Sequence, residues 1–301
     1  MTEHPLAGVY AAAVTPLNPD QSLDLDSLSA LLDFLSARGC HGALLFGTTG
    51  EGPSFSPAER MTLMRAAAQW REANPGFRLL AGTGTPSLTE TADLNRAAFD
   101  LGFEAVVCLP PYYFRKASDD GLFDWFARVI QQSVPSDGFL LGYHFPATAG
   151  IGFSTPLLAR LKDAFPSQFA GIKDSSHDPD LAHHLGDMFG PDLLVLTGTD
   201  TYLRLALEND AGGCITAPAN LISPDLRAVW DAHRNGEDPA PAQARVSALR
   251  HALEGYLPFA PTLKALLHRL HGLPRWSVRP PLQALPADAE ERALADFTSD
   301  H

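Results

Sequence analysis

Eight short apolar runs, each followed by turn residues and a helix-like segment, constrain the fold of this chain most strongly. They occupy residues 8–15, 42–48, 79–85, 105–110, 139–145, 169–173, 193–197 and 213–217. Nearly continuous apolar strands that alternate with amphipathic helices are typical of a parallel sheet covered on its other face. Eight such units in about 220 residues predict a closed (β/α)8 barrel, an α/β fold.

The main alternative is a doubly wound open sheet. Such a sheet normally has fewer strands and a GxGxxG nucleotide loop directly after its first strand. Here the first run ends in Val14-Thr15-Pro16-Leu17, without that loop. The sequence therefore favours the closed barrel.

The segments between and after the runs have helical patterns. Ser56-Pro57-Ala58-Glu59 combines a Ser cap, a Pro at the first helical position and a Glu at the third. After residue 222 there is no convincing strand pattern, and helices are predicted over residues 224–234, 242–256 and 261–271. We therefore predict a barrel catalytic domain over residues 1–222 and a helical C-terminal extension over residues 223–301.

Composition and charge limit the kinds of partner. The 301 residues are 45% hydrophobic and 19% charged, an ordinary globular composition. The formal net charge of −13 disfavours nucleic acid and anionic lipid, but a small anionic substrate stays compatible because a local field can differ from the global one. There is no run of membrane-spanning length and no signal-peptide pattern at the first eight residues, which predicts a cytoplasmic protein.

The three cysteines, Cys40, Cys108 and Cys214, are far apart and show no CxxC pairing. This spacing disfavours a metal site and a disulfide framework. We expect them to be small buried apolar residues. The sequence accordingly predicts no metal site.

Lys173 ends the sixth apolar run, within the hexapeptide GIKDSS at residues 171–176. A lysine is seldom fully buried without a reason, and burial disfavours its charged form. A neutral amine in a dry pocket can attack a carbonyl carbon and form a Schiff base. The alternative, from this hexapeptide alone, is a lysine that leaves the barrel into water where its strand ends.

Catalytic residues of such barrels lie at the carboxyl ends of the strands, so further motifs share one mouth with Lys173. The second run ends in GTTGEG, residues 47–52, whose glycines and hydroxyl groups can bind an anion. The loop lacks the GK[ST] ending of a P-loop, which favours a carboxylate over a triphosphate. The alternative is a tight turn that needs glycine for its backbone angles.

Tyrosines end two other runs. Tyr143 lies on the strand beside that of Lys173, where its hydroxyl can shuttle protons, although a core aromatic residue is the alternative. Tyr112 and Tyr113 follow two prolines and can serve as lid, interface or catalytic residues, of which their spacing alone favours interface packing. By strand parity His144 and Asp174 point away from the pocket, so we expect His144 to be structural and Asp174 to support a turn.

Taken together, these motifs resemble the dihydrodipicolinate synthase / N-acetylneuraminate lyase family. GTTGE, PPYY, Tyr-x-x-Pro from Tyr143 and GIKDSS occur in the family's order and spacing, and the resemblance runs from about residue 8 to residue 281, with VRPPL at 278–282. It implies a (β/α)8 barrel with a helical extension, and a homodimer or homotetramer. It also implies a class I lyase that forms a lysine imine with pyruvate or another 2-oxo acid and needs no other cofactor.

The resemblance further implies a role for individual residues. Lys173 is similar to the Schiff-base lysine and Tyr143 to the proton-transferring tyrosine. Thr48 resembles a hydroxyl that relays protons between Tyr143 and Tyr113, and Tyr113 is expected to come from a neighbouring subunit. The substrate-binding positions implied are Gly47, Thr48, Thr49 and, through its backbone, Ile215.

One departure from the family pattern bears on the substrate. The synthase branch usually has an arginine on this fifth-strand motif that binds the carboxylate of aspartate semialdehyde, and Thr148 stands there in this chain. Losing a bidentate carboxylate partner costs about 1.5–3 kcal/mol. Arg115 and Lys116 can substitute only if their loop folds over a pocket.

The sequence therefore favours aldol cleavage or formation, or dehydration, of a 2-oxo acid, including 3-deoxy sugar acids. One alternative is 4-hydroxy-tetrahydrodipicolinate synthase, which joins pyruvate and aspartate semialdehyde. The other is a 2-oxo acid binding protein that has lost turnover, which the joint presence of Lys173, Tyr143, Thr48 and Tyr113 disfavours.

Overall fold

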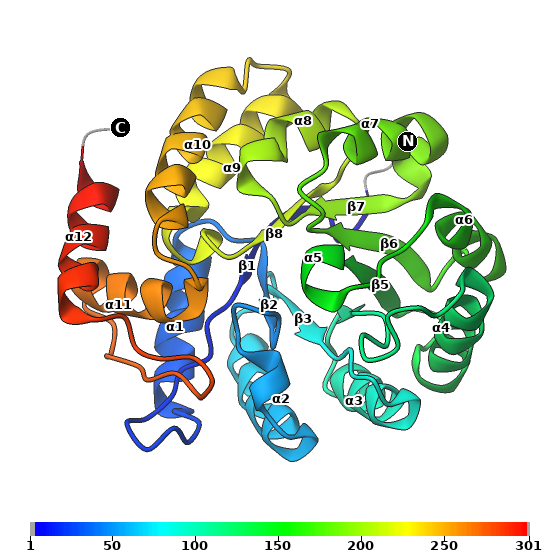
Figure 1. Ribbon diagram of the computed structural model, residues 1–301, viewed down its shortest axis with the longest axis horizontal. Helices are drawn as coiled ribbons and strands as arrows, with labels where there is room; N and C mark the ends of the chain where they lie inside the picture. Colours follow the sequence, from blue (N-terminus) through cyan, green and yellow to red (C-terminus); the bar gives the residue numbers. More distant parts are fainter. Residues whose placement is uncertain (1–3, 300–301) are drawn as a thin grey trace.

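The eight apolar runs form eight parallel strands of one closed barrel in the computed structural model, which describes residues 4–299 (Figure 1). Each strand pairs with the next along the chain, and the last pairs with the first. The predicted (β/α)8 barrel is thereby confirmed. The strands are β1 (Gly8–Ala12), β2 (Gly42–Leu45), β3 (Arg78–Gly82), β4 (Ala105–Cys108), β5 (Phe139–His144), β6 (Phe169–Asp174), β7 (Leu194–Thr197) and β8 (Gly213–Thr216).

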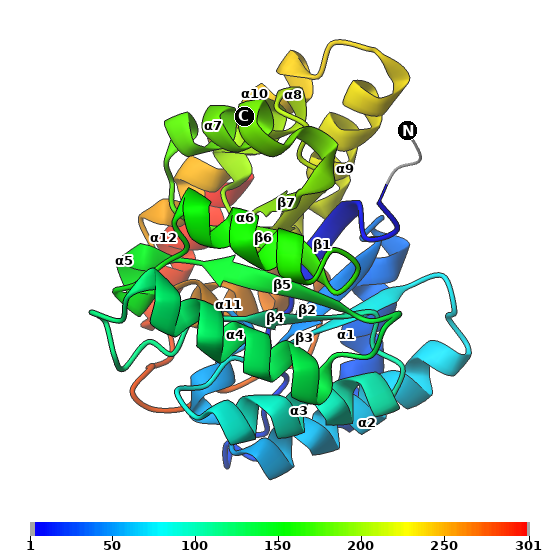
Figure 2. The same cartoon turned by 90° about the vertical axis from the view of Figure 1, so that its right-hand side faces the viewer.

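Helices enclose the barrel, and Figure 2 shows three of them, α3, α4 and α6, in front of the strands. The Ser56 cap is confirmed, because its hydroxyl accepts from the Glu59 amide and the Glu59 carboxylate accepts from the Ser56 amide. The surrounding helices are α1 (Asp26–Ala37), α2 (Pro57–Glu72), α3 (Leu88–Asp100), α4 (Asp119–Ser133), α6 (Thr155–Ala164), α7 (Pro179–Phe189), α8 (Leu203–Glu208) and α9 (Ala219–Asn235). Shorter turns are η1 (Gly52–Ser54), α5 (Pro146–Ala149), η2 (Gly190–Asp192) and η3 (Asp200–Tyr202).

Successive side chains of each strand point alternately into two hydrophobic cores, as on any pleated strand. One core fills the barrel interior with residues such as Tyr10, Leu44 and Ile215. The other packs the outer strand faces against the helices. The cysteines lie buried as predicted, and burial raises the pKa of the Cys40 and Cys108 thiols to about 12.

The C-terminal part is helical, as expected, with α10 (Ala240–Glu254), α11 (Phe259–His271) and α12 (Ala287–Thr298). α12 was not among the predicted helices. α11 packs beside α1, where the rings of Phe34 and His271 lie 4.8 Å apart (Figure 1). The predicted boundary at residues 222 and 223 falls inside α9, next to a kink at Ile222, and the division into two units stays a prediction. From residue 4 to residue 299, no helix is long and apolar enough to cross a membrane.

Candidate active site

Lys173 and Tyr143 lie side by side where β6 and β5 end, because these two residues are paired in the register of the strands. Only 4% of Lys173 and 5% of Tyr143 are exposed. The Lys173 Nζ atom lies 3.9 Å from the centroid of the Tyr143 ring. The burial of Lys173 excludes the alternative of a lysine that points into water.

The hydroxyl of Tyr143 belongs to a small polar cluster. It lies 3.4 Å from Thr48 Oγ1, in the loop that follows β2. Burial raises the pKa of Tyr143, but the positive charge of Lys173 and hydrogen bonds with Lys173, Thr48 and Ser175 together lower it below the ordinary value. A phenol with a lowered pKa is a stronger acid, so this hydroxyl is suited to proton transfer at a carbonyl oxygen.

The loop of residues 47–52 makes a tight turn above this cluster. The Gly52 amide donates to the Gly47 carbonyl and the Glu51 amide donates to the Thr48 carbonyl, each at 3.1 Å. A Cβ atom on Gly52 would lie 2.1 Å from the Phe46 carbonyl oxygen, so the turn itself requires glycine there. Thr48 is exposed at the mouth and Thr49 is buried beneath it. The need for a tight turn therefore accounts for glycine at residue 52.

A narrow cavity beside Tyr143 and Thr48 is lined by a residue that sequence reasoning missed, Arg60 on α2. Its guanidinium is buried and donates to the carbonyl oxygens of Gly52 at 2.6 Å, Phe55 at 3.3 Å and Gly82 at 3.5 Å. Burial lowers the pKa of Arg60. In the sequence, Arg60 could have been noticed only as the residue directly after the capping Glu59. In the structure, its side chain connects the loop of residues 47–52 to the end of β3.

Of the remaining predicted site residues, two lie in or beside the barrel interior and one lies on the surface. Ile215 on β8 is buried inside the barrel, and Gly47 lines the cavity with Thr48. Tyr113, by contrast, is 77% exposed, with its ring 5.4 Å from that of Phe114. Within residues 4–299 it has no hydrogen bond to Thr48 or Lys173. The chain thus brings together Lys173, Tyr143 and Thr48 and leaves Tyr113 on the surface.

His144 and Asp174 have the structural roles predicted for them. His144 Nδ1 accepts from the Phe153 amide at 2.9 Å, which holds the segment after α5 against the barrel. Asp174 Oδ1 accepts from the Ser176 amide at 2.9 Å and so stabilises the turn after β6. Because successive side chains of a strand point to opposite faces, these two residues point away from the pocket that their neighbours Tyr143 and Lys173 face.

Thr148 lies in α5, the short helix that follows Tyr143. Arg115 reaches this helix from the loop after β4, because a Cβ atom on Gly150 would lie 2.5 Å from Arg115 Cδ. The arginine loop therefore does fold toward the segment that carries Thr148. Within the described residues, no group of three His, Cys, Asp or Glu side chains is placed to hold a metal ion.

Nearly the whole chain is similar to known proteins. The family described as "Dihydrodipicolinate synthetase family" matches residues 5–299. A protein of Chloroflexus aurantiacus named "Uncharacterized DapA-like lyase" is 38% identical, over 95% of this chain and 93% of its own length.

Two solved structures are also similar to this chain. Dihydrodipicolinate synthase from Agrobacterium tumefaciens has a TM-score of 0.85 and 31% identity, over 96% of this chain and 98% of that one. YagE, a prophage protein of the dihydrodipicolinic acid synthase family from E. coli K12, was solved in complex with pyruvate. It has a TM-score of 0.89 and 25% identity, over 97% of each chain.

Proposed function

Because this chain belongs to the dihydrodipicolinate synthetase family of lyases, we propose that Lys173 forms an imine with pyruvate or another 2-oxo acid. The observation that carries the proposal is the buried Lys173 amine, 3.9 Å from the centroid of the Tyr143 ring. The polar cluster around Tyr143 supplies a proton donor beside that amine. The pyruvate complex of YagE supports a 2-oxo acid as the substrate class.

The reaction begins when Lys173 releases a proton to water and its neutral amine attacks the keto carbon. Tyr143 protonates the oxygen of the resulting carbinolamine, which leaves as water, and the protonated imine remains. The imine withdraws electrons from the neighbouring carbon, which can lose a proton to give an enamine or break a C–C bond to release an aldehyde. The enamine takes up a proton at this carbon and becomes the protonated imine again. Water from solution then adds to the imine, which returns a proton to Tyr143 and frees the lysine.

Thr48 and Thr49 orient the substrate in this scheme. Their hydroxyl groups and the amides of the loop bind the carboxylate of the 2-oxo acid, which holds the keto carbon against Lys173. Such orientation contributes several kcal/mol to catalysis. Gly47 and the backbone of Ile215 complete the pocket.

Thr148 favours a 2-oxo acid substrate without a second carboxylate, such as a 3-deoxy sugar acid, for cleavage or dehydration. Condensation of pyruvate with aspartate semialdehyde is the second candidate, because Arg115, which carries a positive charge, packs against Gly150 at the end of α5, the helix that contains Thr148. Assays with the two substrate classes separate these candidates. An inert 2-oxo acid binding protein is the third outcome.

The assembly is part of the same proposal. Tyr113, exposed in this chain, reaches the active site of a neighbouring subunit in a homodimer or homotetramer and completes the proton relay through Thr48. The protein acts in the cytoplasm and needs no cofactor beyond the covalent imine. A structure of the assembly with Tyr113 far from every Lys173 would contradict this relay.

Borohydride reduction in the presence of pyruvate tests the proposed chemistry. We expect a reduced pyruvyl adduct on the peptide that contains Lys173, detected by mass spectrometry. Imine formation fixes the carbon skeleton to Nζ, and reduction makes the bond permanent. No adduct with pyruvate or with longer 2-oxo acids, in a folded protein, would refute the imine and favour the binding protein.

The variant Tyr143→Phe is expected to slow exchange of the pyruvate methyl protons with D2O by about 10²- to 10⁴-fold, because it removes the proton donor and keeps the ring. Enamine formation causes this exchange, and NMR measures it without knowledge of the second substrate. Tyr256→Phe, a tyrosine on the C-terminal extension, is the matched control. Equal rates in Tyr143→Phe and wild type would show that Tyr143 transfers no proton.

A further inference from the structure

The carboxylate of Glu51, inside the GTTGEG loop, is bound by the C-terminal extension. Lys264 Nζ on α11 lies 2.5 Å from Glu51 Oε1, and the backbone amide of Arg279 donates to Glu51 Oε2 at 2.8 Å. Both side chains of the ion pair are buried, with 1% of Lys264 and none of Glu51 exposed. Lys264 also donates to the Ser277 carbonyl at 2.7 Å. We call residues 276–279, which follow α11, the strap.

The backbone of the loop needs such an anchor. Glu51 has φ 57° and ψ 27°, and Phe46 has φ 57°, a left-handed conformation that residues with a Cβ atom seldom adopt. Conformations of this kind persist where surrounding contacts hold them, and they concentrate at functional sites. The contacts that hold Glu51 come from Lys264 and Arg279, which follow it in the sequence by 213 and 228 positions.

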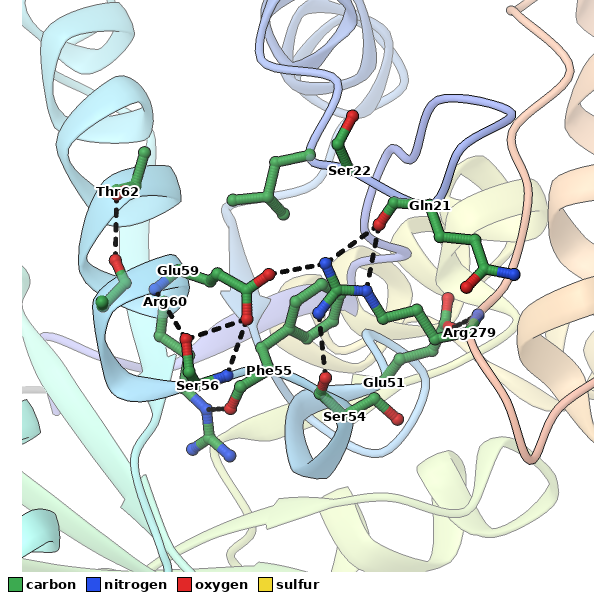
Figure 3. A network of polar contacts seen from close by, with 12 residues as sticks. Gln21, Ser22, Glu51, Ser54, Phe55, Ser56, Glu59, Arg60, Thr62 and Arg279 are labelled. Carbon is green, nitrogen blue, oxygen red and sulfur yellow. Dashed lines mark hydrogen bonds and ion pairs between the residues drawn. The ribbon is translucent and has the colours of Figure 1, made fainter.

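The side chain of Arg279 extends the same clamp to the start of α2 (Figure 3). It donates to the Ser54 carbonyl at 3.0 Å and pairs with Glu59 Oε1 at 2.6 Å. Its guanidinium lies 4.3 Å from the centroid of the Phe55 ring and also donates to the Gln21 carbonyl. The strap thus binds the loop through the Arg279 backbone amide on Glu51, and it binds the turn after the loop through the Arg279 side chain.

We propose that the strap and Lys264 are positioning elements that hold Thr48 and Thr49 in the geometry that binds the substrate carboxylate. This inference rests on the proposed role of that loop as the carboxylate site. It assigns the C-terminal extension a part in substrate binding through the loop, since Lys264 contacts Glu51 and Arg279 contacts Glu51 and Ser54. Glu51, Lys264 and Arg279 act through the loop and are not catalytic residues.

The test uses Arg279→Ala, with Arg275→Ala as the matched control. Arg275 lies one residue before the strap and pairs with Glu290 on α12, away from the loop. Hydrogen exchange of the amides in residues 47–52 measures how firmly the loop is held. We expect faster exchange in Arg279→Ala and wild-type exchange in Arg275→Ala.

Borohydride trapping at Lys173 measures the consequence for substrate binding. In Arg279→Ala we expect the half-saturating pyruvate concentration to rise roughly tenfold to a hundredfold, with a maximal trapping rate near that of wild type. Trapping of acetaldehyde, which has a carbonyl group and no carboxylate, should not change. Arg279→Lys keeps the charge but loses the forked contacts, so it should fall between Arg279→Ala and wild type.

The outcomes separate the two proposals. Unchanged loop exchange in Arg279→Ala, or the same increase in Arg275→Ala, would overturn the Arg279 side chain as an anchor of the loop, whether or not wild type traps pyruvate. Faster exchange with an unchanged pyruvate dependence, or an equal loss with acetaldehyde, would reduce the strap to a structural role. Failure of wild type to trap any 2-oxo acid would refute the proposed function instead, and the exchange data would still decide whether the strap holds the loop.

Discussion

Lys173→Met is expected to lower the rate at which the protein exchanges pyruvate methyl protons with D2O by on the order of 10⁴-fold or more, to the rate in buffer. Removal of a covalent nucleophile typically has an effect of this size. Methionine has nearly the shape of the lysine stem, so packing against the Tyr143 ring is kept while the amine is lost. NMR of the methyl signal measures the exchange, and borohydride trapping should show no adduct on this peptide.

Two comparisons make this result specific. Lys162→Met changes a lysine on the outside of the barrel, where Nζ donates to the Pro166 carbonyl at 3.1 Å, and it should exchange as wild type does. The thermal midpoint of Lys173→Met should stay near or above that of wild type, because a buried amine without an ion pair is replaced by an apolar group. Exchange by a folded Lys173→Met at the wild-type rate would assign the imine to another residue.

The meeting of Lys173 and Tyr143 could be predicted because it follows from local rules. Each strand was recognisable as an apolar run, consecutive strands of a βα barrel are neighbours, and side chains alternate in and out along each strand. These rules place Tyr143 beside Lys173 and turn His144 and Asp174 away, as the register and the hydrogen bonds of the structure have it. Contacts between neighbouring strands need little knowledge of the rest of the chain.

The anchoring of the loop could not be predicted in this way. Glu51 belongs to a recognised motif, but its partners Lys264 and Arg279 lie in a segment whose path depends on how α9, α10 and α11 pack. The sequence pattern indicated helices there and did not indicate which face meets the barrel mouth. The second tyrosine is a related case, because Tyr113 lies at the surface of this chain. The role proposed for it depends on a neighbouring subunit, and the sequence pattern of one chain does not place a neighbour.

Lys264→Met is expected to reduce the free energy of unfolding by about 3–5 kcal/mol, because it leaves the buried Glu51 carboxylate without its counter-charge. None of the Glu51 side chain is exposed, so water cannot replace the ammonium group without opening the loop. Urea denaturation followed by circular dichroism measures the change. A loss below about 1 kcal/mol, the usual range of an exposed pair, would show that the loop rearranges to reach solvent.

The double variant Glu51→Gln/Lys264→Met separates the charge from the contacts. It removes both buried charges and keeps a side-chain oxygen that can accept from the Arg279 amide. Replacing both members of a buried ion pair is often close to neutral, so the double variant should be more stable than Lys264→Met alone. The exposed pair of Asp288 and Arg292 on α12 is the control, since Arg292→Ala should unfold close to wild type. A double variant no more stable than the single one would mean that Lys264 stabilises the fold through its own contacts, such as the bond to the Ser277 carbonyl, and not through the charge of Glu51.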